Sequence, residues 1–339
     1  MISLLIALLI SSLLVCALTP SATGVSLVNA VHVTTQTELR NAITNATTGV
    51  SVVIALDNDI TLSSTPLTIS ANKNITLTSN STNTFFKLIG ASNQHTITVA
   101  AGGKLELAGI TVTHTSNNGT GVYVQSGGTL NLSNGTISGN AARGGSSNSG
   151  YGGGIYNNGG NLTMSGGTIT NNTATGLYGY GGGIYNNNGI FTLSSGTISN
   201  NTANTYGGGI HNNRGNLTIT GGAVLGNIAS SSIGSYGGGI YNNGNFSLFG
   251  GEISNNTANH GGGVAIGNGG RFTMVGGVIS DNTVGNMGGG VYISNINSVV
   301  TMSGGTITNN KSNLYGGGVT NSDGAFTMSG GTITNNTAT

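Results

Sequence analysis

The sequence predicts a right-handed parallel β-helix, a solenoid of about ten turns with three short strands in each turn. Three observations predict it: a repeat of 24 to 30 residues, glycine-rich bends at fixed places in it, and apolar residues that alternate with polar ones between the bends. The hand is expected because crossovers between parallel strands are right-handed in nearly all cases. The repeats are marked by Gly-Gly-Gly motifs that begin at 152, 181, 207, 237, 261, 288 and 316, and by a degenerate copy near Gly121.

Composition limits the classes of function. Only 4% of the 339 residues are charged, against ~25% in an ordinary soluble domain, and the formal net charge is +1. Neither nucleic acid nor an anionic membrane surface is implied as a partner. The 63 glycines accompany only two prolines, which excludes collagen. The only tight acidic pair, Asp57 and Asp59, could hold calcium, but two carboxylates in one turn are more typical of a solvated bend, so we expect neither a metal nor a cofactor.

Residues 1–30 are predicted to be a signal peptide. The only long apolar run, residues 2–18, is 17 residues long and fits the core of such a peptide better than a membrane-spanning helix. The only cysteine, Cys16, lies inside this run, so we expect no disulfide in the mature chain. The prediction is therefore a secreted or cell-surface protein, associated with an outer membrane or a cell wall.

Residues 31–118 are expected to form an N-terminal cap and irregular solenoid turns. Residues 37–43 read as a short amphipathic helix with Thr37 as N-cap, and Leu39, Ala42 and Ile43 lie on one face of it. Such a helix protects the open end of a solenoid, where strand edges and core side chains are bare. Alternating apolar residues predict strands at 52–54, 60–62, 67–69, 75–77, 97–99, 105–107 and 110–112.

Residues 119–339 are expected to form the regular turns. In the repeat that begins at Gly181, period-two alternation places Ile184, Phe191, Leu193 and Ile198 inside the coil, and it places Tyr185, Thr192, Thr197 and Ser199 outside. Pairs such as Gly166-Gly167 fall where the chain must bend between strands, since positive φ is cheap only for glycine.

One asparagine recurs three residues after the aliphatic residue of the third strand. Beside this fixed residue, the preceding position varies. A fixed asparagine predicts a buried ladder in which each side-chain amide bonds to the turns on either side of it. The predicted ladder consists of Asn140, Asn172, Asn201, Asn227, Asn256, Asn282, Asn310 and Asn336.

The pairing of Gly-Gly-aliphatic with Ile-x-x-Asn, as in Gly238-Gly239-Ile240 and residues 253–256, resembles the repeats of polymorphic outer-membrane proteins. More broadly, residues 120–339 are similar to the pectate-lyase-like β-helix of adhesin-like surface proteins. Here Ile or Val replaces the phenylalanine of that family's Phe-x-x-Asn motif. The resemblance implies surface display and adhesion but names no receptor. Because the sequence stops inside a repeat, at 336–339, we expect either a part of a longer surface protein or a truncated reading frame.

The same fold hosts polysaccharide lyases and glycoside hydrolases, so the alternative hypothesis is an enzyme of one of these classes. Hydrolysis of a glycosidic bond needs two carboxylates about 5–10 Å apart. Lyases of this kind need clustered acids to hold calcium and a base to abstract a proton. After Gly152 the only acids are Glu252, Asp281 and Asp323, each in a different turn. We therefore predict no catalytic residue.

The tyrosines are the best candidates for function. Ten of the eleven occupy two positions of the repeat. The first column directly precedes the glycine triplets and contains Tyr151, Tyr180, Tyr206, Tyr236 and Tyr315, with His260 and Met287 as substitutes. The second column lies inside the first strand and contains Tyr123, Tyr156, Tyr185, Tyr241 and Tyr292, with His211, Ala265 and Thr320 as substitutes.

Two interpretations of these columns stay open. Tyrosines repeated at every turn can stack on one another as a purely structural device. Alternatively they form an exposed strip that binds glycans or a neighbouring surface, and glycine triplets beside it would leave that face shallow. The candidate binding residues in that case are Tyr123, Tyr156, Tyr185, His211, Tyr241 and Tyr292.

A minor alternative is ice binding by outward hydroxyl groups, such as those of Thr168, Thr170 and Thr197. Ala223 and Glu252 interrupt these rows, and threonine is common on exposed strands in any case. The sequence thus favours a non-enzymatic, adhesin-like or structural protein of the cell exterior.

Overall fold

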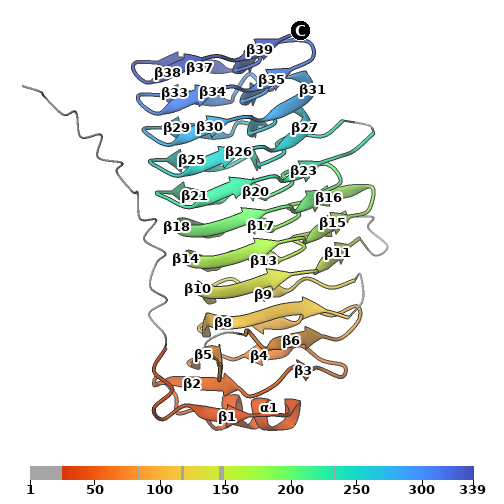
Figure 1. Ribbon diagram of the computed structural model, residues 1–339, viewed down its shortest axis with the longest axis vertical. Helices are drawn as coiled ribbons and strands as arrows, with labels where there is room; N and C mark the ends of the chain where they lie inside the picture. Colours follow the sequence, from red (N-terminus) through yellow and green to blue (C-terminus); the bar gives the residue numbers. More distant parts are fainter. Residues whose placement is uncertain (1–24, 82–83, 116–117, 145–148, 233) are drawn as a thin grey trace, which may run out of the picture.

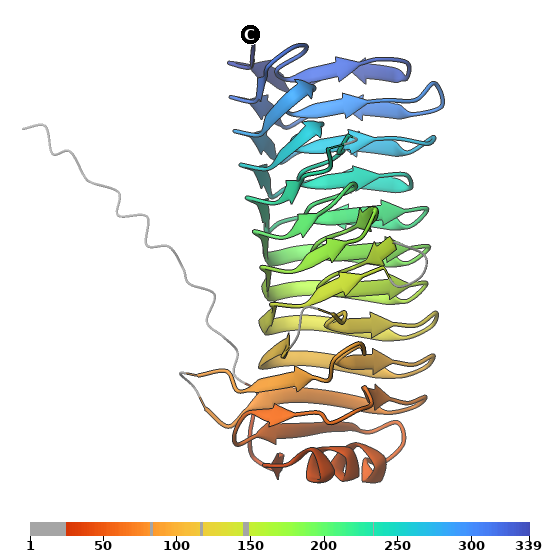
Figure 2. The same cartoon turned by 90° about the vertical axis from the view of Figure 1, so that its right-hand side faces the viewer.

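The computed structural model describes residues 25–81, 84–115, 118–144, 149–232 and 234–339. They form a parallel β-solenoid in which about ten coils stack along one long axis (Figures 1 and 2). The predicted fold class is confirmed. Most of the predicted signal peptide, including Cys16, lies outside the described residues. No helix among the described residues is both long and apolar enough to cross a bilayer.

Three sheets run the length of the regular turns. Sheet A contains β1 (Val31–Val33), β2 (Ser51–Leu56), β3 (Ile60–Thr61), β5 (Asn74–Ser79), β6 (Lys87–Gly90), β8 (Lys104–His114), β10 (Thr129–Ser138), β14 (Asn161–Thr170), β18 (Ile190–Ser199), β21 (Asn216–Ile219), β22 (Ala223–Leu225), β25 (Asn245–Leu248), β26 (Glu252–Ser254), β29 (Arg271–Met274), β30 (Val278–Ser280), β33 (Val299–Met302), β34 (Thr306–Thr308), β37 (Ala325–Met328) and β38 (Thr332–Thr334).

Sheet B contains β4 (Leu67–Ile69), β7 (Ile97–Val99), β9 (Val122–Val124), β13 (Ile155–Asn158), β17 (Ile184–Asn187), β20 (Ile210–Asn213), β24 (Ile240–Asn242), β28 (Val264–Ile266), β32 (Val291–Ile293) and β36 (Val319–Asn321). Sheet C contains β11 (Ala141–Arg143), β15 (Thr173–Thr175), β19 (Thr202–Ala203), β23 (Ile228–Ala229), β27 (Thr257–His260), β31 (Thr283–Met287), β35 (Lys311–Ser312) and β39 (Thr337–Ala338). Beside it, β12 (Ser149–Tyr151) pairs with β16 (Tyr178–Tyr180).

Each strand pairs in parallel with its counterpart one turn away, so identical positions of the repeat form columns along the axis. For example, β13 and β17 align Ile155 with Ile184 and Tyr156 with Tyr185. The three predicted strands of a turn correspond to one strand of sheet B and two segments of sheet A. The two sheet A segments form one continuous strand in β14 and in β18. In the next turn they are two separate strands, β21 and β22, and they stay separate in the later turns. Sheet C adds a short fourth segment, which the sequence did not reveal.

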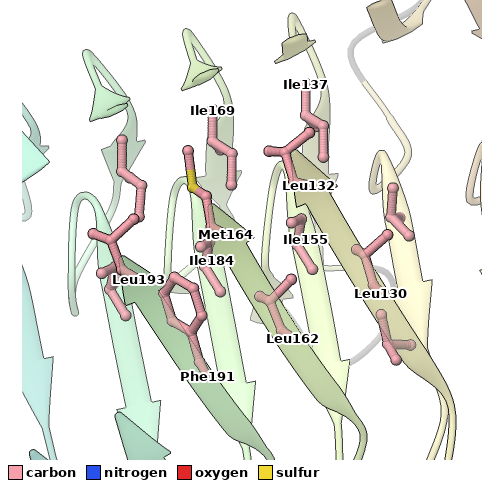
Figure 3. Close-up of a cluster of buried hydrophobic side chains, with 14 of the residues drawn as sticks. Leu130, Leu132, Ile137, Ile155, Leu162, Met164, Ile169, Ile184, Phe191 and Leu193 are labelled. Carbon is pink, nitrogen blue, oxygen red and sulfur yellow. The ribbon is translucent and has the colours of Figure 1, made fainter. Parts of the chain in front are cut away.

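The core is one continuous column of aliphatic, phenylalanine and methionine side chains. The four inward residues predicted in one repeat, Ile184, Phe191, Leu193 and Ile198, are each fully buried. Figure 3 shows how the equivalent residues of adjacent coils stack on one another. In this arrangement each turn buries its apolar side chains against two neighbours, and no turn has a core of its own.

The N-terminal end is closed by α1 (Gln36–Asn45), which lies across the first coil (Figures 1 and 2). Leu39 and Ile43 are buried in the solenoid core, as predicted. The predicted cap residue is wrong by two positions, because the N-cap is Thr35. Its hydroxyl accepts from the Glu38 amide while the Glu38 carboxylate accepts from the Thr35 amide, which forms a complete capping box.

The predicted irregular strands are all present. The pair 105–107 and 110–112 is a single long strand, β8, and the sequence analysis missed β1 and β6. β1 is a three-residue Val-His-Val segment next to the predicted signal peptide, and in β6 the adjacent Leu88 and Ile89 break the alternation.

Candidate functional site

The glycine triplets bring neighbouring coils into backbone contact. A Cβ on Gly182 would lie 2.5 Å from the carbonyl oxygens of Thr202 and of Gly208 in the next turn, closer than real atoms approach. Gly181 has a φ of 66°, which glycine adopts without strain. All three glycines are buried. The expectation that the triplets leave a shallow accessible face is therefore wrong: they are covered because the coils close over them.

The predicted asparagine ladder is confirmed over all eight members. Each Nδ2 donates to the Oδ1 of the asparagine one turn further, at 2.9–3.0 Å, from Asn140 through to Asn336. The same Nδ2 also donates backwards, as Asn201 does to the carbonyl of Ile169 at 3.0 Å. Each amide thus links three successive coils and satisfies backbone groups that would otherwise be buried without partners.

The residue before each ladder asparagine has a restricted backbone conformation, although the residue type varies. It has positive φ at every turn, for example 54° at Asn200, 64° at Gly226 and 56° at Asp281. Glycine, asparagine and aspartate are the residues that tolerate this left-handed conformation best. The apparent variability is therefore a choice among three residues with one backbone requirement.

A second buried ladder escaped the sequence analysis. In the Ile-Tyr-Asn-Asn segment the first asparagine points inward, and Asn157, Asn186, Asn212 and Asn242 are joined by Nδ2 to Oδ1 bonds of 2.7 Å. Each also donates to a glycine carbonyl at the following bend. The signal was available in the repeated Asn-Asn pair, whose first member occupies an inward position by period-two alternation.

The second tyrosine column, proposed above as a binding strip, is largely covered. Tyr185 is 7% exposed and Tyr241 6%, Tyr292 and His211 are also buried, and Tyr123 and Tyr156 are half-buried. These side chains do point away from the core, as predicted, but other aromatic rings lie over them. The expectation that Tyr156, Tyr185 and Tyr241 form an exposed row is wrong for Tyr185 and Tyr241. We call these residues, with His211, the inner column.

The rings that cover them belong to the residues before the glycine triplets. Tyr151, Tyr180, Tyr206 and Tyr236, with His260, are half-buried and are called the outer column. Successive rings stack almost in parallel, with centroids 4.9–5.6 Å apart and interplanar angles of 9–16°. They also contact the inner column, as Tyr206 does Tyr241 at 4.6 Å. The two columns together form a double aromatic layer on the outside of the solenoid.

The stacking decides what the outer column presents to solvent. Because ring faces along the axis are occupied by neighbouring rings, the accessible parts are ring edges and phenolic hydroxyls. Burial, followed by the nearby tyrosines, raises the pKa of Tyr180, and it acts in the same way on Tyr206 and Tyr236. These phenols therefore stay protonated and uncharged at neutral pH.

The inner hydroxyls are held by the second asparagine of the Asn-Asn pair. Asn158 donates to Tyr123 at 3.1 Å, and Asn187 and Asn213 hydrogen bond to Tyr156 and Tyr185. These asparagines are themselves joined across turns at 2.8 Å. Every residue of the Ile-Tyr-Asn-Asn segment therefore makes a contact that repeats from one coil to the next.

Acidic residues are scattered over the molecule. Glu252 is an exposed sheet A residue between Ala223 and Val278, Asp281 is an exposed bend residue, and Asp323 lies in the turn after β36. Near the N-terminus, Asp57 contacts the His32 ring at 2.8 Å. Within the described residues, no three histidine, cysteine or acidic side chains come close enough to hold a metal ion.

Sheet A carries an outward row of hydroxyl residues that the sequence analysis did not single out. Its members face one another across seven consecutive turns without interruption: Thr163, Thr192, Thr218, Ser247, Thr273, Thr301 and Thr327. The rows considered earlier, through Thr168 and Thr170, are interrupted as expected at Ala223 and Glu252.

Comparison of the chain with protein-family models, with curated proteins and with solved structures finds no match.

Proposed function

We propose that this protein is a non-enzymatic β-solenoid of the cell exterior that serves adhesion or a structural role, and that it contacts glycans or a neighbouring surface through the outer column. One observation carries the proposal. The outer column is a continuous row of half-exposed aromatic residues in register with the coils. Repetition of a weak contact at every turn suits recognition of an extended partner by avidity.

Along the stacked rings, the chemistry of the outer column favours contact with uncharged polar groups of a partner. Ring edges and neutral phenols offer apolar contact together with hydrogen bonds, the combination that makes tyrosine frequent at interfaces. Close by, Leu177 and Tyr178 are exposed and extend the same side of the molecule. Glycans match such a surface because they present hydroxyl groups and apolar C–H patches side by side.

The first test is a glycan panel. The full chain is compared with a variant in which Tyr180, Tyr206 and Tyr236 are all changed to phenylalanine. This change keeps the ring stack and removes the hydroxyls, so folding is preserved while hydrogen bonding is lost. We expect binding by the original chain and at least a tenfold loss in the variant. Equal binding by both would remove the outer column from the proposal.

The enzymatic alternative, a polysaccharide lyase or glycoside hydrolase, is tested by a turnover assay. Incubation of acidic and neutral polysaccharides with the full chain, followed by assays for reducing ends and unsaturated products, is expected to give no turnover. Release of either product would replace the adhesin proposal.

The Ser/Thr row of sheet A supports ice binding as a second candidate. A flat row of regularly spaced hydroxyl and methyl groups is a surface that can order water. Thermal hysteresis of the full chain, compared with a Thr192→Lys/Thr218→Lys variant, checks this candidate. Hysteresis that the variant loses would favour it, and its absence in the original chain would dismiss it.

A further inference from the structure

A cleft of about 250 Å³ lies where the aromatic double layer meets the irregular turns. Its lining includes Gln94 and His95 from one coil, Asn118 from the next, and Arg143, Tyr151 and Tyr156 from the first fully regular turn. Pockets for drug-sized ligands have volumes of about 300–1,000 Å³, so this smaller cleft suits a single small ring. The lining combines two aromatic rings, several amides and one guanidinium group.

Tyr151 is the first ring of the outer column, and this makes it different from the others. Its ring contacts Tyr156 in the same turn, and it contacts Tyr180 and Tyr185 in the next turn, toward the C-terminal side. Among the described residues no aromatic ring stacks on its N-terminal side, where the equivalent position of the preceding turn is Asn118. The side chain of Asn118 donates to Asn93 and so is held at the cleft. The ring of Tyr151 therefore lines the cleft, whereas the rings further along are stacked on a neighbouring ring on this side.

The cleft has a single permanent charge. Arg143 is exposed at the end of β11. It forms no ion pair among the described residues, whose one ion pair joins His32 and Asp57. None of the seven acidic residues of the sequence lines the cleft. Burial, and secondarily the charge of His114, lower the pKa of His95, so this ring is neutral at neutral pH. The local potential is positive, and no carboxylate competes for the guanidinium.

We propose that this cleft binds one sugar residue that carries an anionic substituent, with the pyranose ring against Tyr151 and the anion on Arg143. Arginine pairs with carboxylate or sulfate oxygens through two parallel hydrogen bonds, and an aromatic face accepts the C–H side of a ring. The amides of Gln94 and Asn118 provide donors and acceptors for ring hydroxyls. The inference rests on the proposed function and specifies the site and the ligand class.

The test is a titration of the full chain with glucose, glucuronate and glucose 6-sulfate, followed by ligand-observed NMR. We expect both charged sugars to bind at least tenfold more tightly than glucose. Arg143→Gln, at an exposed position where folding is unaffected, should abolish that preference. Arg271→Gln, an exposed arginine on sheet A, is the matched control and should preserve it. The ratio of the two charged sugars separates carboxylate from sulfate recognition.

Tyr151→Leu should weaken the binding of all three sugars at least tenfold, while the midpoint of the unfolding transition stays the same. Binding of charged sugars that is unchanged in Arg143→Gln and Tyr151→Leu would overturn the cleft assignment and leave the outer column proposal standing. Absence of any glycan binding by the original chain, on this series and on the larger panel, would overturn both.

Discussion

The irregular turns, residues 31–118, and the regular turns, residues 119–339, share one core but differ in what joins their coils. Both bury an unbroken column of aliphatic side chains. The described residues of the irregular turns contain neither asparagine ladder, and the first ladder begins at Asn140, whose Oδ1 is buried without a partner. The core column and the parallel pairing of strands are therefore enough to stack coils without the ladders. The ladders, glycine triplets and aromatic layer are additions that impose one register on the regular turns.

This difference assigns a physical role to each part of the repeat. Glycine lets backbones touch, the first asparagine of each pair and the ladder asparagine satisfy buried backbone groups, and the inner tyrosine covers the outside of sheet B. The outer column and the Ser/Thr row remain as surfaces with free groups. The regular turns should therefore lose stability when one of these additions is removed.

The largest effect is expected for Gly182→Ala. Its Cβ would collide with two backbone carbonyls, so the coils must separate, and we expect a loss of about 4 kcal/mol or more in unfolding free energy. Gly285→Ala is the control, since the nearest atom to its Cβ is a side-chain nitrogen at 3.9 Å. Urea unfolding followed by circular dichroism measures both variants. Equal stability would contradict backbone contact at the triplet.

Asn201→Ala should cost about 3 kcal/mol. The change leaves the Asn172 amide and the Ile169 carbonyl buried without their partners, at about 1–3 kcal/mol for each such group. Asn131→Ala, on the exposed face of β10, should change stability by less than about 0.5 kcal/mol. Urea unfolding followed by circular dichroism measures the stability of both variants. A loss at Asn201 no greater than at Asn131 would show that the ladder is dispensable.

Acid should destabilise the regular turns through His211. Burial lowers its pKa to about 3, and both ring nitrogens lack hydrogen-bond partners. Below pH 6.5 the unfolded chain binds a proton that the folded chain does not. Stability from this residue is therefore complete above pH 6.5 and falls by ~1.4 kcal/mol per pH unit toward pH 3, or about 2 kcal/mol by pH 5.

His211→Tyr restores the residue that the inner column usually has and should remove this part of the acid dependence. The rings around His211, including Tyr185 and Tyr241, do not titrate in this range. Unfolding free energies at pH 7 and pH 5 are compared for the two chains. A pH dependence that is identical in both would contradict the burial of His211.

The smallest effect is expected for the outer column. Tyr206→Ala removes ring contacts with Tyr236, Tyr241 and His211, which should cost about 1 kcal/mol. Tyr206→Phe keeps the rings and should be neutral within about 0.5 kcal/mol. Thermal unfolding compares them. A large loss for Tyr206→Phe would mean that its hydroxyl is structural and not free for a partner.

The fold could be predicted because its determinants are local in the sequence. Period-two alternation placed Ile184 and Phe191 inside, and the spacing of Asn172 and Asn201 predicted their ladder. The cover over Tyr185 could not be predicted in this way. It depends on where the segment before the glycine triplet places its ring relative to Tyr185, which alternation within a single strand does not specify.

The cleft at Tyr151 escaped prediction for a related reason. It arises where a regular coil meets an irregular one, and the repeat pattern carries information only about positions that repeat. The left-handed φ at Asn200 was likewise hidden, because several residue types satisfy it.

The central claim is that, from Tyr180 to Tyr292, the two tyrosine columns differ in accessibility: the inner Tyr185, Tyr241 and Tyr292 are buried, and the outer Tyr180, Tyr206 and Tyr236 are open to a partner. Nitration of the folded full chain with tetranitromethane, mapped by peptide mass spectrometry, tests it most directly. We predict nitration at Tyr180, Tyr206 and Tyr236, with Tyr315, which is 61% exposed, as the fastest site. Tyr185 and Tyr241 should stay unmodified until the chain unfolds. Nitration of the two columns at equal rates in the folded protein would contradict the account.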